Sequence, residues 1–459
     1  MRDTIAAIAT GPVRSAVGII RLSGPEAIAA AAAVFRATSG RSLTEYENRH
    51  LVLGALLDRA GNLVDQVLAT VSRAPESYTG EDTAELQCHG SPAVLTLGLE
   101  ALFAQGVRQA RPGEFTRRAF LNGKLDLTQA EAVADLIDAE TQAAARIAGG
   151  QLSGALSRRI GAVYDALVDV SAHFHAVLDY PDEDIDAFGA ETLDRALEGA
   201  ERDLSALLDT YRRGKLLVGG IPCAIVGKPN TGKSSLLNAL LGYERAIVTD
   251  IPGTTRDTVE EKCTLGGRLL RLIDTAGIRE TGDAVERIGV ERSRRALAGA
   301  ELALVLVDLT RPLDEVDKDL FREAVERAGQ VILVGTKADL PQAHPLSLPW
   351  SAEKPVPVVS LSSRTGEGLP ALEEAIAACF PSEGGEERGE MLTNARQAGA
   401  ARRALEQVRA ARESLALGMT PDAVLVDVEG AMEALGELTG RTLREDVTAR
   451  IFERFCVGK

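Results

Sequence analysis

Short apolar runs, each followed by a polar loop, recur through the central part of the chain. Runs of about four to eight apolar residues are typical of buried strands, and their alternation with helices indicates a parallel sheet. The central part therefore predicts an α/β domain. It has a helix at 235–241 and strands within five segments, 221–226, 269–273, 301–308, 330–335 and 356–363.

The regions of the chain on either side have different patterns. Residues 126–215 and 392–455 are rich in Ala and Leu with a period of 3.6, which predicts long helices, interrupted by an acidic turn at 180–186. The first 125 residues alternate apolar runs with turns and contain an Ala-rich helix that opens at Gly24-Pro25. The strands predicted there are 17–22, 50–57, 64–71 and 84–88.

Helical sequence on both sides of an α/β module indicates an insertion, since insertions succeed where chain ends are close and exposed. We therefore predict a multidomain fold, α/β plus all-α, with a discontinuous helical domain. The predicted segments are an N-terminal α/β domain, a first helical segment, an inserted α/β domain and a second helical segment, at 1–125, 126–216, 217–382 and 383–459.

Composition adds little about partners. The net charge is −16 over 459 residues, and the excess acid lies in the middle of the chain, so bulk charge does not indicate a nucleic-acid partner. Two basic clusters are either local nucleic-acid patches or solvated helix faces, and both interpretations stay open. Their members are Arg108, Arg111, Arg117, Arg118 and Lys124, and Arg396, Arg402, Arg403, Arg409 and Arg412.

Three further features favour a cytoplasmic protein without a membrane span. No apolar run approaches ~18 residues. The start of the chain, with Asp3 and Gly11-Pro12, lacks the pattern of a cleavable signal. The five cysteines have neither paired nor metal-like spacing and fit a reducing compartment; they are Cys88, Cys223, Cys263, Cys379 and Cys456.

The most informative motif lies between the first central strand and its helix. It reads Gly227-Lys228-Pro229-Asn230-Thr231-Gly232-Lys233-Ser234 and has the layout of a phosphate-binding P-loop. Glycines let backbone N–H groups turn toward an anion, and the helix N-terminus adds partial positive charge. Lys233 can reach the β and γ phosphates as a catalytic group, and Ser234 can bind Mg²⁺.

Later segments narrow the nucleotide to GTP (with GDP as its product). Asp274 can hold Mg²⁺ through water, and Asp339 can accept from guanine N1 and N2, which adenine cannot satisfy. The loop 249–257 can fold over the nucleotide, and the loop after 360 suits guanine O6. The candidate GTP-binding residues are Asn230, Thr231, Gly232, Lys233, Ser234, Ser235, Thr249, Asp250, Ile251, Pro252, Gly253, Thr254, Thr255, Asp274, Thr275, Ala276, Gly277, Thr336, Lys337, Ala338, Asp339, Ser362, Ser363 and Arg364.

These motifs predict that the inserted domain at 217–382 is a Ras-like P-loop GTPase domain. They resemble those of the translation-factor-related GTPases, with two departures. Thr336 stands where the usual Asn-Lys-x-Asp motif has Asn; we expect its hydroxyl to bond the P-loop backbone, with some loss of affinity. Ile278 stands where Ras-like enzymes have a water-orienting Gln. Asn230 is therefore a candidate ligand for a monovalent cation beside the phosphates, and Glu286 a candidate to position water, with a solvated helix-start acid as its alternative.

Outside the P-loop, four segments are more specific. They are 18–24 (Gly-Ile-Ile-Arg-Leu-Ser-Gly), 78–90, 111–127 (which begins Arg-Pro-Gly-Glu-Phe) and the C-terminal Phe455-Cys456-Val457-Gly458-Lys459. With the inserted GTPase module, they make the whole chain resemble the tRNA-uridine-modification GTPases of the MnmE or TrmE family.

The resemblance implies a homodimer that works with an FAD-dependent partner of the MnmG or GidA type. Together they would build an aminomethyl or carboxymethylaminomethyl group on C5 of the tRNA wobble uridine. The one-carbon donor would be a 5-formyl or 5,10-methylene tetrahydrofolate on the N-terminal domain, which also dimerises. The folate residues carried over are Arg21, Glu85, Lys124 and Lys459.

The resemblance also implies which residues bind metal ions and gives a role to one cysteine. It implies Mg²⁺ on Ser234 and Thr255, and K⁺ on Asn230, Thr249, Ile251 and Thr254. Glu286 takes the water-orienting position. Cys456 is either a nucleophile near the modification site or a packing residue.

Two other functions stay open. A ribosome-assembly GTPase of the Era type shares the GTPase module, but it predicts a KH-like or basic RNA-binding appendage, which we do not find in this sequence. A folate-dependent enzyme for a small molecule, with GTP as regulator, does not account for the extent of helix around the insertion.

Overall fold

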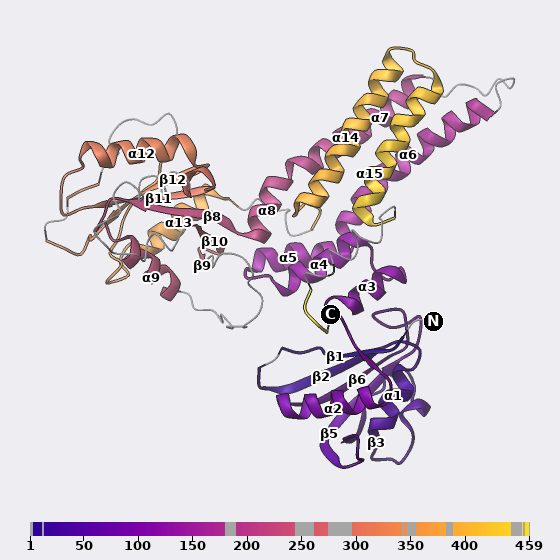
Figure 1. Ribbon diagram of the computed structural model, residues 1–459. Coiled ribbons are helices and arrows are strands. Elements are labelled where there is room, and N and C mark those ends of the chain that lie inside the picture. Colours follow the sequence, from indigo (N-terminus) through magenta and orange to yellow (C-terminus); the bar gives the residue numbers. More distant parts are fainter. Residues whose placement is uncertain are drawn as a thin grey trace. The chain divides into compact units, whose positions relative to one another are not determined.

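The structure is a computed structural model. It describes residues 3–11, 13–179, 190–243, 261–273, 296–341, 344–346, 355–381, 389–441, 452 and 455–458 (Figure 1). Contacts divide the chain into two compact units. The first comprises 1–137, 151–204 and 400–459, and the second comprises 138–150 and 205–399.

The first unit contains a seven-stranded sheet in the order β3-β4-β5-β6-β2-β1-β7, in which only β1 and β7 pair in parallel among the described strands. Its elements are β1 (Ile5–Ile8), β2 (Ser15–Ser23), α1 (Ala27–Val34), β3 (Phe35–Ala37), η1 (Leu43–Glu45), β4 (Val52–Leu57), β5 (Leu63–Ser72), β6 (Thr83–Gly90), α2 (Pro92–Ala104) and β7 (Arg108–Gln109). The four strands predicted in this region are confirmed.

Side-chain alternation gives this sheet an apolar face and a more polar face. Ile20 and Leu22 on β2, and Leu86 on β6, are fully buried in one core with α1 and α2. Between them, Arg21 and Glu85 point to the other face and are opposite each other in the register. The strand pattern thus places a charged pair on the face away from α1 and α2, where Phe115 of α3 (Glu114–Leu121) packs beside Ile5 and Ala7 of β1.

Helices complete the first unit. They are α3 (Glu114–Leu121), α4 (Leu127–Ile137), α6 (Ala155–Asp179), most of α7 (Ala190–Asp209) and of α14 (Ala395–Ala416), and α15 (Pro421–Thr439). Buried residues of α6 recur at intervals of three and four, the period of a helix face packed against helices: Leu156, Ile160, Val163, Leu167, Val170 and Phe174. Packing of α15 on α6 joins segments about 250 residues apart.

The second unit contains a six-stranded sheet in the order β13-β12-β11-β8-β10-β9, parallel except for β9. Its elements are α5 (Gln142–Leu152), α8 (Tyr211–Gly219), β8 (Ile221–Gly227), α9 (Lys233–Tyr243), β9 (Glu261–Leu265), β10 (Arg268–Ile273), β11 (Leu302–Asp308), α12 (Glu315–Arg327), β12 (Gln330–Thr336), β13 (Val358–Ser360) and α13 (Leu369–Cys379).

Two apolar clusters cover the two faces of this sheet, one with α9 and α13 and the other with α12. The central strand β11 is buried along almost its whole length, as expected for a parallel strand between two helical layers. The last strand lies within the predicted segment 356–363 and begins after Pro357, which has no N–H to donate to a neighbour. The acidic turn at 180–186 lies outside the described residues.

Candidate functional site

The P-loop connects β8 to α9 in the second unit. Asn230 (φ 63°) and Gly232 (φ 90°) have left-handed backbone, which lets the loop turn tightly before the helix. The Nζ of Lys233 donates to the carbonyls of Gly227 (2.8 Å) and Lys228 (2.7 Å). Burial lowers the pKa of Lys233. The ammonium is thus held against its own loop, directed by two carbonyls rather than left to rotate.

Thr336 links the P-loop to the end of β12. It is 2% exposed, and its hydroxyl lies 2.7 Å from the carbonyl oxygen of Thr231 and 3.1 Å from that of Val307. The expected bond to the P-loop backbone is therefore present in the structure. A threonine hydroxyl has one hydrogen to donate, so the two carbonyls share a single donor.

We expect Thr336→Val to destabilise the second unit by about 1–3 kcal/mol, because two buried carbonyls lose their donor while the shape is kept. GDP affinity should fall in parallel, since the P-loop loses its tie to β12. Thermal unfolding and GDP titration measure both effects. The half-buried Thr264 on β9 offers a matched control, Thr264→Val. Unchanged unfolding and affinity in Thr336→Val would contradict this role.

The loops after β12 and β13 lie side by side. The N–H of Ala338 donates to the carbonyl of Leu361 (3.2 Å), and Ser362 is buried. The Asp339 side chain is 17% exposed and lies 3.9 Å from the exposed guanidinium of Arg364. Carboxyl ends of parallel strands meet at one sheet edge, so these loops share an edge with the P-loop.

Lys337 has a structural partner at the same edge. Its Nζ donates to Asp308 at the end of β11 (2.6 Å). Burial raises the pKa of Asp308, but hydrogen bonds from Lys337 and Thr310 outweigh it and leave the pKa below its usual value. Lys337 itself has left-handed backbone (φ 61°).

Ser234 and Ser235 lie in the first turn of α9, half-buried and exposed respectively, and Ser363 is half-buried beside Ser362. The remaining candidates in the nucleotide site lie outside the described residues. They are Thr249, Asp250, Ile251, Pro252, Gly253, Thr254, Thr255, Asp274, Thr275, Ala276, Gly277 and Glu286.

Two of the four candidate folate residues form an ion pair in the first unit. The Nε of Arg21 lies 2.7 Å from Oε1 of Glu85, and the guanidinium also lies over the rings of Tyr78 (5.7 Å) and Phe115 (5.9 Å). The exposed Lys124 follows α3, and its stem passes beside Gly80. Lys459 lies outside the described residues.

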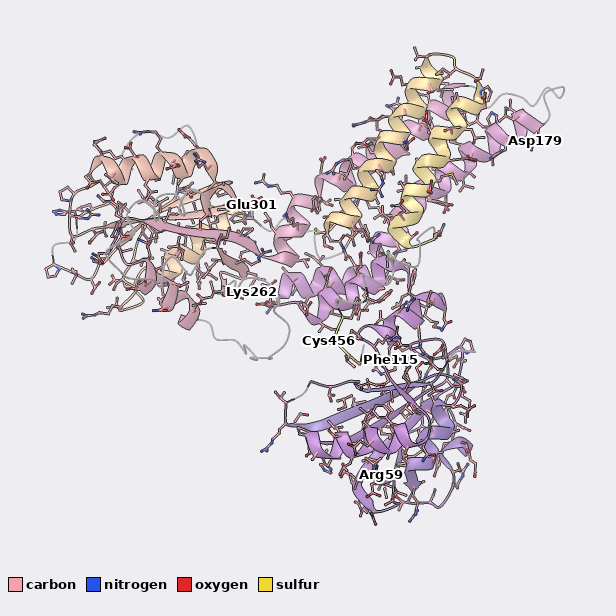
Figure 2. All side chains as sticks on the ribbon, viewed as in Figure 1. Arg59, Phe115, Asp179, Lys262, Glu301 and Cys456 are labelled. Carbon is pink, nitrogen blue, oxygen red and sulfur yellow. The ribbon has the colours of Figure 1, made fainter. Side chains whose placement is uncertain are left out.

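Cys456 is exposed on the C-terminal segment, labelled in Figure 2. Its carbonyl accepts from the N–H of Gly113, the N-cap of α3 (3.3 Å). The ring of its neighbour Phe455 packs against the ring of Phe452, with 5.4 Å between the ring centroids. The backbone and the phenylalanines therefore anchor this segment, and among the described residues no side chain hydrogen-bonds the Cys456 thiol.

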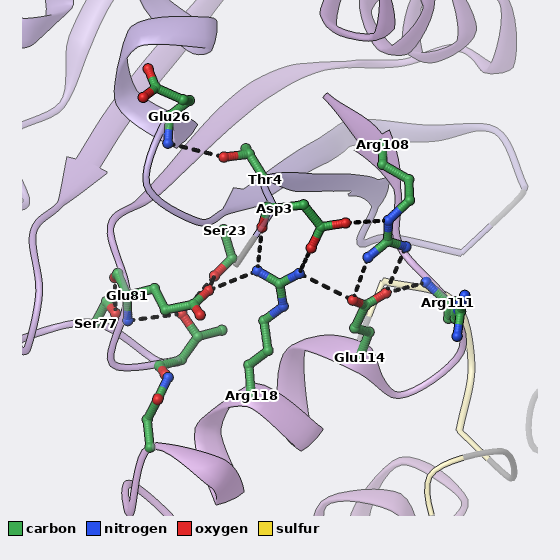
Figure 3. Close-up of polar contacts among 12 residues, drawn as sticks. Asp3, Thr4, Ser23, Glu26, Ser77, Glu81, Arg108, Arg111, Glu114 and Arg118 are labelled. Carbon is green, nitrogen blue, oxygen red and sulfur yellow. Dashed lines mark hydrogen bonds and ion pairs between the residues drawn. The ribbon is translucent and has the colours of Figure 1, made fainter. Parts of the chain in front are cut away.

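Two members of the first basic cluster, Arg108 and Arg118, are paired with carboxylates. Arg118 is 7% exposed and donates to Glu81 (2.9 Å), to Asp3 (2.9 Å) and to Glu114 (3.1 Å), as Figure 3 shows. Arg108 pairs with the same Asp3 and Glu114. Hydrogen bonds from Arg108 hold the pKa of Asp3 at about 2. For these two arginines, neither the nucleic-acid patch nor the solvated helix face describes the structure.

Three members of the second basic cluster also form ion pairs. Arg412 pairs with Asp194 and Glu201 (2.9 and 2.7 Å), Arg409 pairs with Glu201 (2.8 Å), and Arg403 contacts Glu437. These pairs tie α14 to α7 and α15. Sequence reasoning missed them because the partners lie far apart along the chain.

Within the described ranges, no group of three or more His, Cys, Asp and Glu side chains is arranged to hold a metal ion. None of the described helices is long and apolar enough to cross a membrane.

Family models match nearly the whole chain. The model described as "GTP-binding protein TrmE N-terminus" matches residues 4–124, and the "MnmE helical domain" model matches residues 127–456. The chain belongs to the MnmE family. The resemblance recognised in its sequence is therefore confirmed.

Curated members of the MnmE family match this chain from end to end. The proteins named tRNA modification GTPase MnmE from Carboxydothermus hydrogenoformans and Symbiobacterium thermophilum are 42% and 44% identical to it, over 100% of this chain and 100% and 99% of theirs. The one from Chloroflexus aurantiacus is 44% identical over 100% of both chains.

Among solved structures, the G domain of the T. maritima FeoB iron transporter is 30% identical over 34% of this chain and 96% of that chain. Its TM-score of 0.25 is too low to carry an argument about the fold.

Proposed function

We propose that this protein is a GTP-hydrolysing tRNA modification enzyme. With an FAD-dependent partner of the MnmG type, it adds an aminomethyl or carboxymethylaminomethyl group to C5 of the wobble uridine (position 34) of certain tRNAs. The observation that carries the proposal is the end-to-end match to relatives named tRNA modification GTPase MnmE. The P-loop and the two adjoining base loops support the GTPase activity within this proposal.

In this proposal, Lys233 stabilises charge on the transferred phosphate and Asp339 selects guanine. Oxygen ligands suit hard cations, so Ser234 with Thr255 would hold Mg²⁺. Asn230 with Thr249, Ile251 and Thr254 would hold K⁺, whose charge would replace an arginine finger. The left-handed backbone of Asn230 is compatible with a side chain in that loop position. Glu286 would position the attacking water.

The side chains of Arg21, Glu85 and Lys124 in the first unit suit the polar groups of a tetrahydrofolate. A carboxylate such as Glu85 suits the N–H donors of a pterin, and the aromatic rings of Tyr78 and Phe115 lie beside Arg21. Cations such as Arg21, Lys124 and Lys459 suit the glutamate carboxylates of the folate. Bound there, the folate would supply the one-carbon unit, and the exposed Cys456 is the candidate nucleophile of this site.

We propose the four-segment organisation of the chain, with the GTPase domain at 217–382 inserted between the helical segments 126–216 and 383–459. The N-terminal segment 1–125 would bind folate and form the homodimer. The packing of α15 on α6 supports one helical domain made from both sides of the insertion. We place the protein in the cytoplasm, where its tRNA substrate and reduced thiols are found.

GTP turnover should be at least tenfold faster in potassium than in sodium, because Ile278 cannot orient water and a K⁺ ion beside Asn230 would supply the missing positive charge. Hydrolysis rates at equal ionic strength in KCl and NaCl measure this. Asn230→Ala should lose the difference between the salts, with the sodium rate little changed. Equal rates of the unaltered protein in the two salts would remove the cation from the proposal.

Mass analysis of wobble uridine nucleosides tests the tRNA function. Cells that lack the protein should lose the C5-modified nucleosides, and re-expression of the full chain should restore them. Unchanged nucleosides, together with a defect in ribosomal subunits, would favour a ribosome-assembly GTPase of the Era type instead.

A further inference from the structure

Lys228, the second residue of the P-loop, is bound to another element of the second unit. Its side chain is 16% exposed, although lysine on a loop is usually solvated. Its Nζ contacts Asp314 and lies 3.3 Å from Oδ2 of Asp317. Both aspartates belong to the start of α12, and the P-loop is therefore attached to a helix 86 residues further along the chain.

The two aspartates that accept from Lys228 are held in place by further contacts. Asp314 caps α12 by accepting from the N–H groups of Val316 and Asp317, and Asp317 accepts in return from the N–H of Asp314 (3.2 Å). Asp317 is 4% exposed, and Arg311 lies 3.6 Å from it. Two cations thus balance two carboxylates, and a buried carboxylate that keeps its partners holds a single position.

The carbonyl of Lys228 connects this contact to the phosphate-binding lysine. Its carbonyl accepts from the Nζ of Lys233 (2.7 Å) and from the hydroxyl of Thr231 (2.8 Å). One residue therefore joins α12, through its side chain, to the phosphate-binding lysine, through its carbonyl. We infer that Lys228 is a positioning residue for GTP hydrolysis, which aims Lys233 by anchoring the P-loop to α12. The inference rests on the proposed GTPase function.

Without the Lys228 ammonium, Arg311 alone would face two carboxylates, and residue 228 would lose its anchor. The loop amides and Lys233 would still attract phosphate, so nucleotide binding should change little. The transition state depends on placement within less than about 1 Å, and a small displacement of Lys233 should act on the chemical step. Loss of the anchor should therefore lower kcat and leave the binding constants nearly unchanged.

Single-turnover hydrolysis at saturating GTP, GDP titration and thermal unfolding of the full-length protein test this. Lys228→Met should lower the hydrolysis rate about tenfold or more, with less than about a threefold change in GDP affinity. Lys228→Arg should recover most of the rate, because a guanidinium can also bridge the two carboxylates. Asp317→Asn keeps the cap and removes the charge, so it should act in the same direction as Lys228→Met.

The matched control is Lys318→Met, which removes another ion-paired lysine of α12 (2.7 Å from Glu315) and should leave the rate unchanged. Unaltered hydrolysis in Lys228→Met would overturn the inference. Loss of GDP binding and of thermal stability in Lys228→Met and Asp317→Asn together would assign the contact to folding alone and would also overturn it. Failure of the proposed function would differ, since the unaltered protein itself would not hydrolyse GTP.

Discussion

Lys233→Met should lower the rate of GTP hydrolysis at saturating nucleotide by about a hundredfold or more. The Nζ of Lys233 is aimed by the carbonyls of Gly227 and Lys228, and the residue begins the helix at the end of the P-loop. A preorganised cation in a partly dry site stabilises the charge that develops on the phosphate, and removal of one such donor costs about 10²–10³ in kcat. Methionine keeps the length and the apolar stem but loses the charge.

Single-turnover hydrolysis with Mg²⁺ measures this effect. The matched control is Lys262→Met on β9, whose Nζ pairs with Glu140 (2.6 Å) at a half-exposed position away from the P-loop. The control should hydrolyse GTP as the unaltered protein does. Hydrolysis by Lys233→Met within about threefold of the unaltered rate would show that the chemistry uses another site.

Asp339→Asn should lower GDP affinity by about a hundredfold or more and create affinity for XDP. The Asp339 carboxylate can accept from both N1–H and the N2 amino group of guanine, and each hydrogen bond to a charged group is worth about 1.5–3 kcal/mol. Xanthine has a carbonyl in place of the N2 amino group. An asparagine can donate to that carbonyl while it accepts from N1–H, so the pairing is restored with the other base.

Titration of the two proteins with GDP, XDP and ADP measures this change of preference. The unaltered protein should bind GDP and reject XDP, and the variant should prefer XDP. Because XDP binding requires a folded site, the gain separates base recognition from simple loss of structure. An Asp339→Asn variant that loses GDP without gaining XDP would not support this role for Asp339.

The regular elements and the P-loop could be predicted from local pattern. The apolar run before Gly227 and the helix after it are determined by neighbouring residues, and β8 and α9 lie where the pattern predicts them. The Thr336 contact could also be predicted, because a hydroxyl at the end of a buried strand has few acceptors other than the adjoining loop.

Contacts between charged side chains far apart in the sequence could not be predicted. Arg118 meets Asp3 across 115 residues, and Lys228 meets Asp317 across 89. Neither pair leaves a periodic signal, and an arginine that is buried and paired has the same sequence signature as a solvated one. The sequence of the basic clusters is therefore compatible with both interpretations, because it does not indicate which carboxylates surround them.

Calorimetric titration of the full-length protein with GDP and with ADP, in Mg²⁺ and KCl, tests the central claim most directly. That claim is that the loop after β8 binds phosphate and that Asp339 selects guanine. The account predicts saturable heat with GDP and none with ADP at the same concentrations. Absence of heat with GDP, or equal affinity for the two nucleotides, would contradict it.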